Sequence, residues 1–197
     1  MFVVIDGPDG SGKTTLAKQL TDRLNQEGTS AIYTCEPTFS SEAGQKLRDM
    51  MRTGEIGDIY QFANLFVEDR KTHIADLIEP TLANGKTVVC DRYKYSALAY
   101  QQLQGVDATY LVEINKPCLV PDIIFILTPQ SPDILLERIK SRGTTRDIFE
   151  EIEFLSNTLE LYRRLPDYFP DERIVFLDAG ASVEDNIAII QQRMCIS

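Results

Sequence analysis

A glycine-rich segment near the N-terminus has the residue types and the spacing of a phosphate-binding loop. Gly7 and Gly12 lie five positions apart, and Lys13 and Thr14 follow the second glycine, which is the Walker A pattern. In such a loop, consecutive backbone N–H groups and the N-terminus of the next helix surround a phosphate chain. The lysine then bridges the β- and γ-phosphates of a nucleoside triphosphate, and the threonine hydroxyl binds Mg²⁺. The candidate triphosphate-binding residues are Gly7, Pro8, Asp9, Gly10, Ser11, Gly12, Lys13, Thr14 and Thr15.

The elements that would hold this loop are short apolar runs separated by longer helical stretches. The runs are rich in Val, Ile and Phe without strict alternation, which is typical of strands buried on both faces of a parallel sheet. Leucines at 16, 20 and 24 predict an amphipathic helix after the loop, ending at Gly28. We therefore predict a three-layer α/β fold of the P-loop NTPase type, with helices on both faces of a five-stranded parallel sheet. The predicted strands span residues 2–5, 31–35, 87–90, 123–127 and 174–177.

Two more helices are predicted further along the chain. Apolar residues at 65, 74, 77 and 78 indicate a long helix that ends between Pro80 and Gly85. A second helical stretch covers residues 148–165 and is expected to stop before Pro166. Each helix would connect two of the predicted strands, as the doubly wound fold requires.

The length and composition of the chain indicate one globular domain, residues 1–197. It has 197 residues, of which 43% are hydrophobic and 25% charged, and no apolar run approaches the roughly 18 residues that span a membrane. Nothing at the N-terminus has the pattern of an export signal, so we expect a cytoplasmic protein with no membrane partner. The net charge of −10 opposes general nucleic-acid binding. The four separated cysteines favour reduced thiols over a zinc or redox site.

Two charged residues follow the third predicted strand directly. Asp91 would lie at the carboxyl edge of the sheet, where ligands of open α/β sheets bind. A carboxylate there can orient water on Mg²⁺, so Asp91 joins Thr14 as a candidate metal residue. Arg92 would offer a bidentate fork to a phosphate.

Phe66 and Arg70 lie four residues apart in the long predicted helix and therefore share one face. A flat apolar ring beside hydrogen-bond donors is what a nucleobase pocket needs, because stacking adds roughly 1 to 3 kcal/mol per base and hydrogen bonds select its edge. The alternative is that Phe66 is ordinary core and that Arg70 pairs with a neighbouring acid, Glu68 or Asp69.

Several longer motifs together resemble the thymidylate kinase family. The most specific are Leu65-Phe-Val-Glu-Asp-Arg70 and Asp91-Arg-Tyr-Lys-Tyr-Ser96-Ala-Leu-Ala-Tyr100-Gln101. Glu36-Pro37-Thr38, His73 and Pro121-Asp122 add to the resemblance, which extends from residue 5 to about residue 162. The chain departs from the family pattern at Cys35, at residues 38–40, and at Lys94, Ala97 and Gln102.

The resemblance implies transfer of the γ-phosphoryl group of Mg·ATP to dTMP by a homodimer. It implies that Phe66 stacks on thymine, that Arg70 donates to a base carbonyl and that Gln101 faces the base. Tyr100 would lie at the sugar 2′ position, Asp9 near the 3′-hydroxyl, and Glu36 near Mg²⁺ and the phosphates. Arg48 and Arg92 would hold the acceptor phosphate. The candidate substrate-binding residues are Asp9, Glu36, Pro37, Arg48, Phe66, Arg70, Arg92, Ser96, Tyr100 and Gln101.

A basic segment, Lys140-Ser-Arg-Gly-Thr-Thr-Arg146, resembles the lid of the same family, at about residues 140–147. Lid closure would exclude water and bring arginines to the transferred group. Because the phosphate-binding loop contains no arginine, we expect Arg142 or Arg146 to act beside Lys13 and Arg92 in catalysis. A solvated basic loop is the alternative for this segment.

Two other functions stay open on the sequence alone. One is a kinase for another deoxynucleotide or for a deoxynucleoside, and the other is an ATP-binding sensor without turnover, since the phosphate-binding loop is shared by many enzymes. A phosphate acceptor is already an anion and needs no general base. His73, the only histidine, is therefore expected to be structural rather than catalytic.

Overall fold

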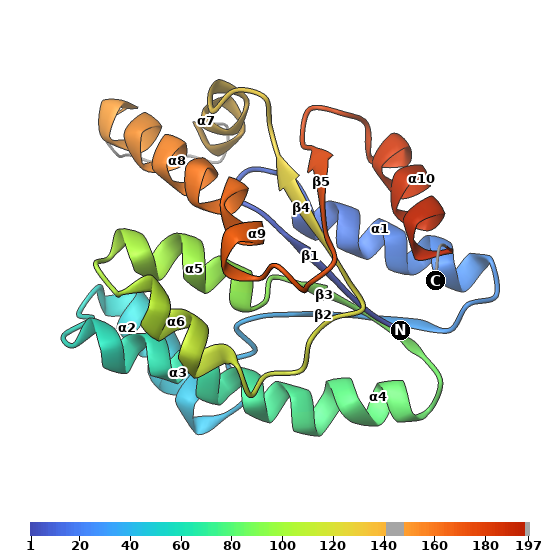
Figure 1. Cartoon of the computed structure of the whole chain (residues 1–197), viewed down its shortest axis with the longest axis horizontal. Helices are drawn as coiled ribbons and strands as arrows, with labels where there is room; N and C mark the ends of the chain where they lie inside the picture. Colours follow the sequence, from blue (N-terminus) through green and yellow to red (C-terminus); the bar gives the residue numbers. More distant parts are fainter. Residues whose placement is uncertain (141–147, 196–197) are drawn as a thin grey trace.

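A computed structural model describes residues 1–140 and 148–195, apart from the side chains of residues 139–140 and 148–151. Its centre is a sheet of five parallel strands in the order β2-β3-β1-β4-β5 (Figure 1). The predicted five-stranded parallel sheet is thereby confirmed. The strands are β1 (Phe2–Asp6), β2 (Ala31–Cys35), β3 (Thr87–Asp91), β4 (Ile123–Thr128) and β5 (Ile174–Asp178).

Helices cover both faces of the sheet, as predicted from the apolar strands. Alternate residues of β1 face opposite ways. Val3 belongs to an apolar cluster with the helices at residues 13–26 and 183–194, whereas Val4 belongs to one with the helices at residues 59–73, 94–103 and 148–163. Figure 1 shows these two groups on either side of the strands. The helices are α1 (Lys13–Gln26), α2 (Glu42–Thr53), α3 (Ile59–His73), α4 (Glu79–Ala83), α5 (Lys94–Leu103), α6 (Ala108–Asn115), α7 (Asp133–Lys140), α8 (Ile148–Arg163), α9 (Leu165–Tyr168) and α10 (Val183–Met194).

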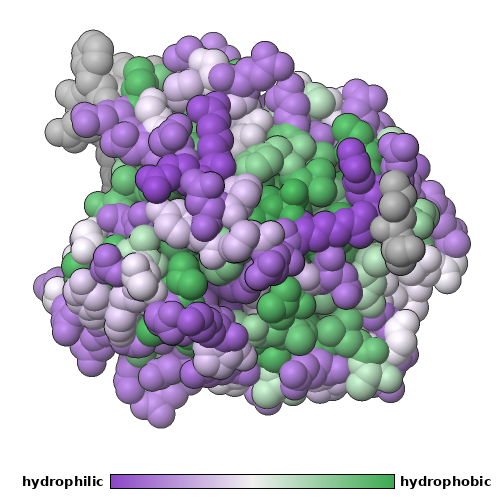
Figure 2. Space-filling model, viewed as in Figure 1, coloured by the Kyte–Doolittle hydropathy of each residue, from purple (hydrophilic) through white to green (hydrophobic). Residues whose placement is uncertain are grey.

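The surface in the view of Figure 2 is mostly hydrophilic, with apolar patches between the polar side chains. Among the described residues, no helix is both long enough and apolar enough to cross a membrane. The large apolar side chains that are exposed among the described residues are Met51, Tyr60, Leu77, Val120, Phe176 and Ile189.

The long predicted helix is interrupted by one π-helical turn, η1 (Ile74–Ile78), between α3 and α4. A π turn holds more residues than an α turn, so it rotates everything after it relative to the α-helical pattern. Ile74 and Ile78 are buried, but Leu77, whose apolar side chain helped to predict this helix, is 36% exposed. The helix predicted for residues 148–165 is α8, which ends at Arg163 and so stops before Pro166 as predicted. Pro166 lies in the first turn of the short helix α9, where its missing N–H costs nothing.

The connection from β2 to α2 is held by the carboxylate of Asp69 on α3. This buried carboxylate accepts hydrogen bonds from the Thr38 amide and hydroxyl, both at 2.7 Å, and from the Ser41 hydroxyl at 2.8 Å. Ser41 in turn caps α2 by accepting from the Gly44 amide at 2.8 Å. Thr38 and Ser41, two polar residues that follow β2, are therefore bound to one acid.

Replacing Gly44 by alanine is expected to lower the free energy of unfolding by about 1 to 3 kcal/mol, the usual cost of overpacking. An added Cβ would lie 2.4 Å from Asp69 Oδ1 and 2.7 Å from Phe39 Cα, and a backbone atom cannot move aside cheaply. Urea denaturation measures the change. Gln45→Ala, at the exposed next position of α2, is the control, and equal midpoints for the two variants would contradict the prediction.

Candidate functional site

The predicted phosphate-binding loop connects β1 to α1 at the carboxyl edge of the sheet. Gly7, Gly10 and Gly12 have φ angles of 149°, 79° and 95°, which glycine adopts far more readily than other residues. At Gly7 an added Cβ would lie 2.5 Å from the Leu127 carbonyl oxygen, so this position has no room for a side chain. The Lys13 ammonium group donates to the Pro8 carbonyl at 3.2 Å, inside the curve of the loop.

A buried acid that the sequence analysis missed connects this loop to α5 and α8. Asp6, the last residue of β1, is fully buried. Its Oδ1 accepts from the Gly7 amide at 2.8 Å, the Ser96 hydroxyl at 2.7 Å and the Tyr162 hydroxyl at 2.9 Å. Its Oδ2 accepts from the amides of Tyr93 and Ser96 at 3.1 Å each. The sequence did contain a signal for Asp6, because it is an acidic residue at the end of a buried apolar strand.

The two predicted metal residues meet at the start of α1. The Thr14 hydroxyl donates to Asp91 Oδ2, and among the described residues Asp91 Oδ1 is buried without a hydrogen-bond partner. Burial raises the pKa of Asp91, against the opposing effect of the Thr14 hydrogen bond. Buried acceptors are normally satisfied, so this free oxygen needs a partner that protein atoms do not provide. An oxygen-only donor set with one vacant carboxylate position fits Mg²⁺.

Arg92 and Lys13 converge on Asp9. The Arg92 guanidinium forms an ion pair with Asp9 and donates to the Ser96 hydroxyl at 3.2 Å, while the Lys13 ammonium lies 3.5 Å from Asp9. Burial alone would raise the pKa of Asp9, but the two cations outweigh it and lower that pKa. Burial and the nearby Arg92 charge lower the pKa of Lys13. Two partly desolvated cations thus share one carboxylate where two phosphates would have to approach each other.

The backbone of Arg92 is in the left-handed region, with φ of 69°, which is unusual for a residue with a side chain. Its amide donates to the Ile5 carbonyl at 3.0 Å, which holds this conformation next to β1. Residues kept in such conformations cluster at functional sites, and here the strain directs the guanidinium toward the loop.

A cavity of about 650 Å³ adjoins the loop on the side of Asp9. Every predicted substrate-binding residue except Arg48 lines it. Tyr100 also contributes a hydroxyl that accepts from the Asp9 amide at 3.0 Å, and burial raises its pKa to about 12, so the phenol is neutral. The lining residues already predicted are Asp9, Glu36, Pro37, Phe66, Arg70, Arg92, Ser96, Tyr100 and Gln101. Those not predicted include Met50, Met51, Ile56, Phe62, Tyr93, Ala97 and Gln104.

Arg48 lies elsewhere. It is exposed on α2, and its guanidinium lies 4.9 Å from the centre of the Phe39 ring, in a cation–π contact. The expectation that it joins the substrate pocket gains no support from this position.

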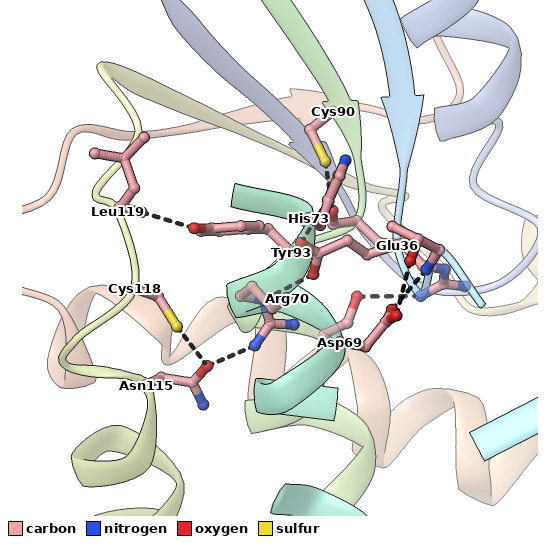
Figure 3. Close-up of polar contacts among 12 residues, drawn as sticks. Glu36, Asp69, Arg70, His73, Cys90, Tyr93, Asn115, Cys118 and Leu119 are labelled. Atoms are coloured by element: carbon pink, nitrogen blue, oxygen red, sulfur yellow. Dashed lines mark hydrogen bonds and ion pairs between the residues drawn. The ribbon is translucent and has the colours of Figure 1, made fainter. Parts of the chain in front are cut away.

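The far end of the cavity contains the ring of Phe66 and the guanidinium of Arg70. Phe66 packs edge-on against Phe62, with ring centres 5.1 Å apart, and is only partly buried. Arg70 is 2% exposed and donates from Nε to Glu36 Oε2 at 2.7 Å (Figure 3). Arg70 therefore pairs with an acid, as the alternative interpretation from the sequence expected. That acid is Glu36, however, and not Glu68 or Asp69. Burial alone would lower the pKa of Arg70, but Glu36 outweighs it and raises that pKa.

A smaller cavity of about 250 Å³ lies on the other side of the loop. Its walls combine loop residues Gly10 to Gly12 with apolar residues of β4 and the segment after β5, a suitable surface for the base of a triphosphate donor. Arg138 of α7 also lines it, and its Nη1 lies 3.4 Å from the carbonyl oxygens of Gly10 and Ser11. The sequence analysis assigned Arg138 no role. Arg142 and Arg146 fall outside the described residues.

Comparison with known proteins assigns the chain to a family. The family model described as thymidylate kinase matches residues 5–190. A probable thymidylate kinase of Pyrococcus horikoshii is 38% identical over 189 residues, covering 93% of this chain and 90% of the relative. One from Thermococcus onnurineus is 36% identical over 193 residues, with 94% and 92% covered. The thymidylate kinase of Brachyspira hyodysenteriae is 36% identical over 162 residues, with 82% and 78% covered. Together with the loop and the two cavities, these matches show that the chain belongs to the thymidylate kinase family.

Proposed function

We propose that this enzyme transfers the γ-phosphoryl group of ATP to the 5′-phosphate of dTMP, giving dTDP and ADP for dTTP synthesis. The observation that carries the proposal is the arrangement of the two cavities. Asp9 lines the larger one and its neighbour Gly10 lines the smaller one, so the phosphate-binding loop forms a common wall. Two nucleotides bound there would meet phosphate to phosphate beside Lys13 and Arg92.

The larger cavity has the chemistry of a pyrimidine deoxynucleotide site. Phe66 provides a ring for stacking, and Arg70 and Gln101 provide donors for the edge of the base. Tyr100 lies between that end and Asp9, where its neutral phenol would limit space beside the sugar. The cationic end at Arg92 suits the acceptor phosphate, since an arginine fork matches phosphate geometry.

The reaction needs alignment and charge neutralisation more than proton transfer. An oxygen of the acceptor phosphate forms a bond to the γ-phosphorus while the bond from that phosphorus to the β–γ bridging oxygen breaks. The nucleophile is already an anion, so no general base is required. Lys13 and Arg92 neutralise charge at the junction of the two phosphates. We propose that Arg142 or Arg146 adds a further positive charge there.

Mg²⁺ fits the donor set found at the start of α1. Thr14 and Asp91 are the residues that would hold it, directly or through water, and the bound ion would neutralise charge on the oxygens of the triphosphate.

We further propose that the chain is a single domain that acts in the cytoplasm as a homodimer. All five strands belong to one sheet, which supports one domain. The dimer and the location rest on membership in the family. Light scattering after size-exclusion chromatography would contradict the dimer if the mass of one 22.3 kDa chain were found.

A panel of acceptors, followed by ADP release, tests the proposed reaction. We expect the highest kcat/KM with dTMP, a lower value with dUMP because it lacks the methyl group, and much lower values with dCMP and dGMP. Thymidine should give no turnover, because its neutral 5′-hydroxyl would need a base, and the carboxylates that line the cavity, Asp9 and Glu36, are already paired with Arg92 and Arg70. Faster turnover of thymidine than of dTMP, or ADP release that does not depend on an acceptor, would overturn the proposal.

A further inference from the structure

The guanidinium of Arg70 is held by three different elements at the base end of the acceptor cavity. Nε donates to Glu36 Oε2 at 2.7 Å, and Nη1 donates to Asn115 Oδ1 on α6. Its carbon Cζ lies 5.0 Å from the centre of the Tyr93 ring, which covers one face. Among the described residues, no hydrogen bond uses Nη2 of Arg70. Nη2 therefore keeps both of its N–H donors for a ligand, and Nη1 keeps one.

Glu36 holds Arg70, and His73 holds Glu36. The Nδ1 atom of His73 lies 3.0 Å from Glu36 Oε1, so each carboxylate oxygen has one partner (Figure 3). The other ring nitrogen, Nε2, lies 2.7 Å from the Thr34 hydroxyl on β2. Because a carboxylate only accepts, Nδ1 carries a proton and donates it. Thr34, His73, Glu36 and Arg70 thus form one hydrogen-bonded chain that joins β2 to α3, and its three buried members are at most 7% exposed.

The same residues could suggest a metal site, since single ligand atoms of Glu36, His73 and Cys90 lie within 4.8 Å of one another. The contacts argue against it. Both oxygens of Glu36 are engaged by His73 and Arg70, and the Cys90 thiol donates to the Arg92 carbonyl at 3.1 Å. Burial raises the pKa of Cys90 well above its usual range, which opposes the thiolate that a metal requires. A cation would also lie close to the Arg70 guanidinium.

We propose that His73 is a positioning residue for recognition of the acceptor base, acting through Glu36 on Arg70. The inference rests on the proposed function, in which Arg70 donates to a carbonyl of thymine. Thymine and uracil carry a carbonyl at ring position 4, whereas cytosine carries an amino group there. Arginine has no acceptor, so a guanidinium that cannot turn away leaves a cytosine amino group facing another donor. Polar mismatches of this kind discriminate strongly between bases.

Removal of the His73 ring would leave Glu36 Oε1 without its donor, and the carboxylate could then rotate together with Arg70. Discrimination between carbonyl and amino groups should fall, whereas discrimination for the methyl group should not, because His73 does not line the cavity. The expected loss of discrimination therefore concerns only ring position 4 of the base. A general loss of folded enzyme would lower the rates for all acceptors by the same factor.

Three variants test the proposal: His73→Leu, His73→Asn and Thr34→Val. Asparagine keeps an amide donor near the position of Nδ1, leucine removes both nitrogens, and valine removes the partner of Nε2. The readouts are kcat/KM and calorimetric affinity for dTMP, dUMP and dCMP at saturating ATP. We expect leucine to lower the preference for dTMP over dCMP about tenfold, valine to lower it about threefold, and asparagine to restore most of it.

The preference for dTMP over dUMP is the matched control and should stay unchanged in every variant, as should the KM for ATP. If His73→Leu lowers the rates with dTMP and dCMP equally, the role is only structural and the proposal is wrong. If that variant does not fold, an unchanged preference in Thr34→Val overturns the proposal equally well. Wild-type enzyme that does not phosphorylate dTMP would instead contradict the proposed function.

Discussion

Replacing Lys13 by alanine is expected to lower kcat with dTMP and ATP about 10³-fold. Lys13 is 6% exposed, and its ammonium group lies within the loop that would surround the phosphates. A charge fixed in a site shielded from water stabilises developing negative charge far more than a solvated one, and loss of a single such donor lowers kcat by about 10² to 10³. Because Lys13 would contact both the transferred phosphoryl group and the leaving group, we expect a decrease in kcat at the upper end of this range.

Initial rates of ADP release measure this effect. Lys18→Ala is the matched control, because Lys18 is exposed on the same helix and its only described contact is a cation–π contact with Tyr33, 5.3 Å from the ring centre. Thermal melts should show that both variants fold. Activity of the Lys13 variant within tenfold of the wild type would mean that the loop does not bind the reacting phosphates.

Replacing Arg92 by alanine is expected to lower kcat/KM for dTMP by about 10² to 10³, with a smaller change in the KM for ATP. The guanidinium joins Asp9 and Ser96 at the phosphate end of the acceptor cavity, and its removal leaves Asp9 with a weaker partner, Lys13 at 3.5 Å. Arg92→Lys should recover only part of the activity. Lysine keeps the charge but lacks the planar fork that binds two oxygens.

Because the backbone of Arg92 is left-handed, comparing two substitutions separates the effect on dTMP binding from the effect on stability. Arg92→Gly removes the same side chain as alanine but fits a φ of 69° without strain. The glycine variant should therefore be at least as stable as the alanine variant and equally impaired with dTMP. Arg23→Ala, an exposed arginine on α1, is the control for loss of a surface charge. Equal effects of Arg92→Ala on dTMP and ATP would contradict a role on the acceptor side.

The strands and the phosphate-binding loop could be predicted because their signals are local. Each strand is a short run of apolar residues, and the loop is one continuous segment between β1 and α1. The position of Asp91 followed as well, since the carboxyl ends of parallel strands meet at one edge of the sheet. The π turn at Ile74–Ile78 could not be predicted, because the apolar pattern on either side of it fits an ordinary helix.

The partners of the buried charges were beyond the reach of local patterns. Helical spacing placed Glu68 and Asp69 near Arg70, yet Arg70 pairs with Glu36, 34 residues earlier in the chain, and Asp69 holds the loop before α2. Asp6 could have been noticed at the end of β1, but its partners could not be predicted, because its five hydrogen bonds come from Gly7, Tyr93, Ser96 and Tyr162. For Arg48 the family resemblance predicted a place in the substrate pocket, but its guanidinium lies over the ring of Phe39.

The sequence by itself therefore determined where phosphate would bind, since backbone amides, a lysine and a hydroxyl within eight residues need only one turn to converge. It also determined which ring and which cation share a helix face at the base end. Only the tertiary structure decided how that cation is held. A hydrogen bond joins Thr34 of β2 to His73 of α3, and the chain after β2 brings Glu36 to His73 and Arg70 in a buried place where each charge must find a partner.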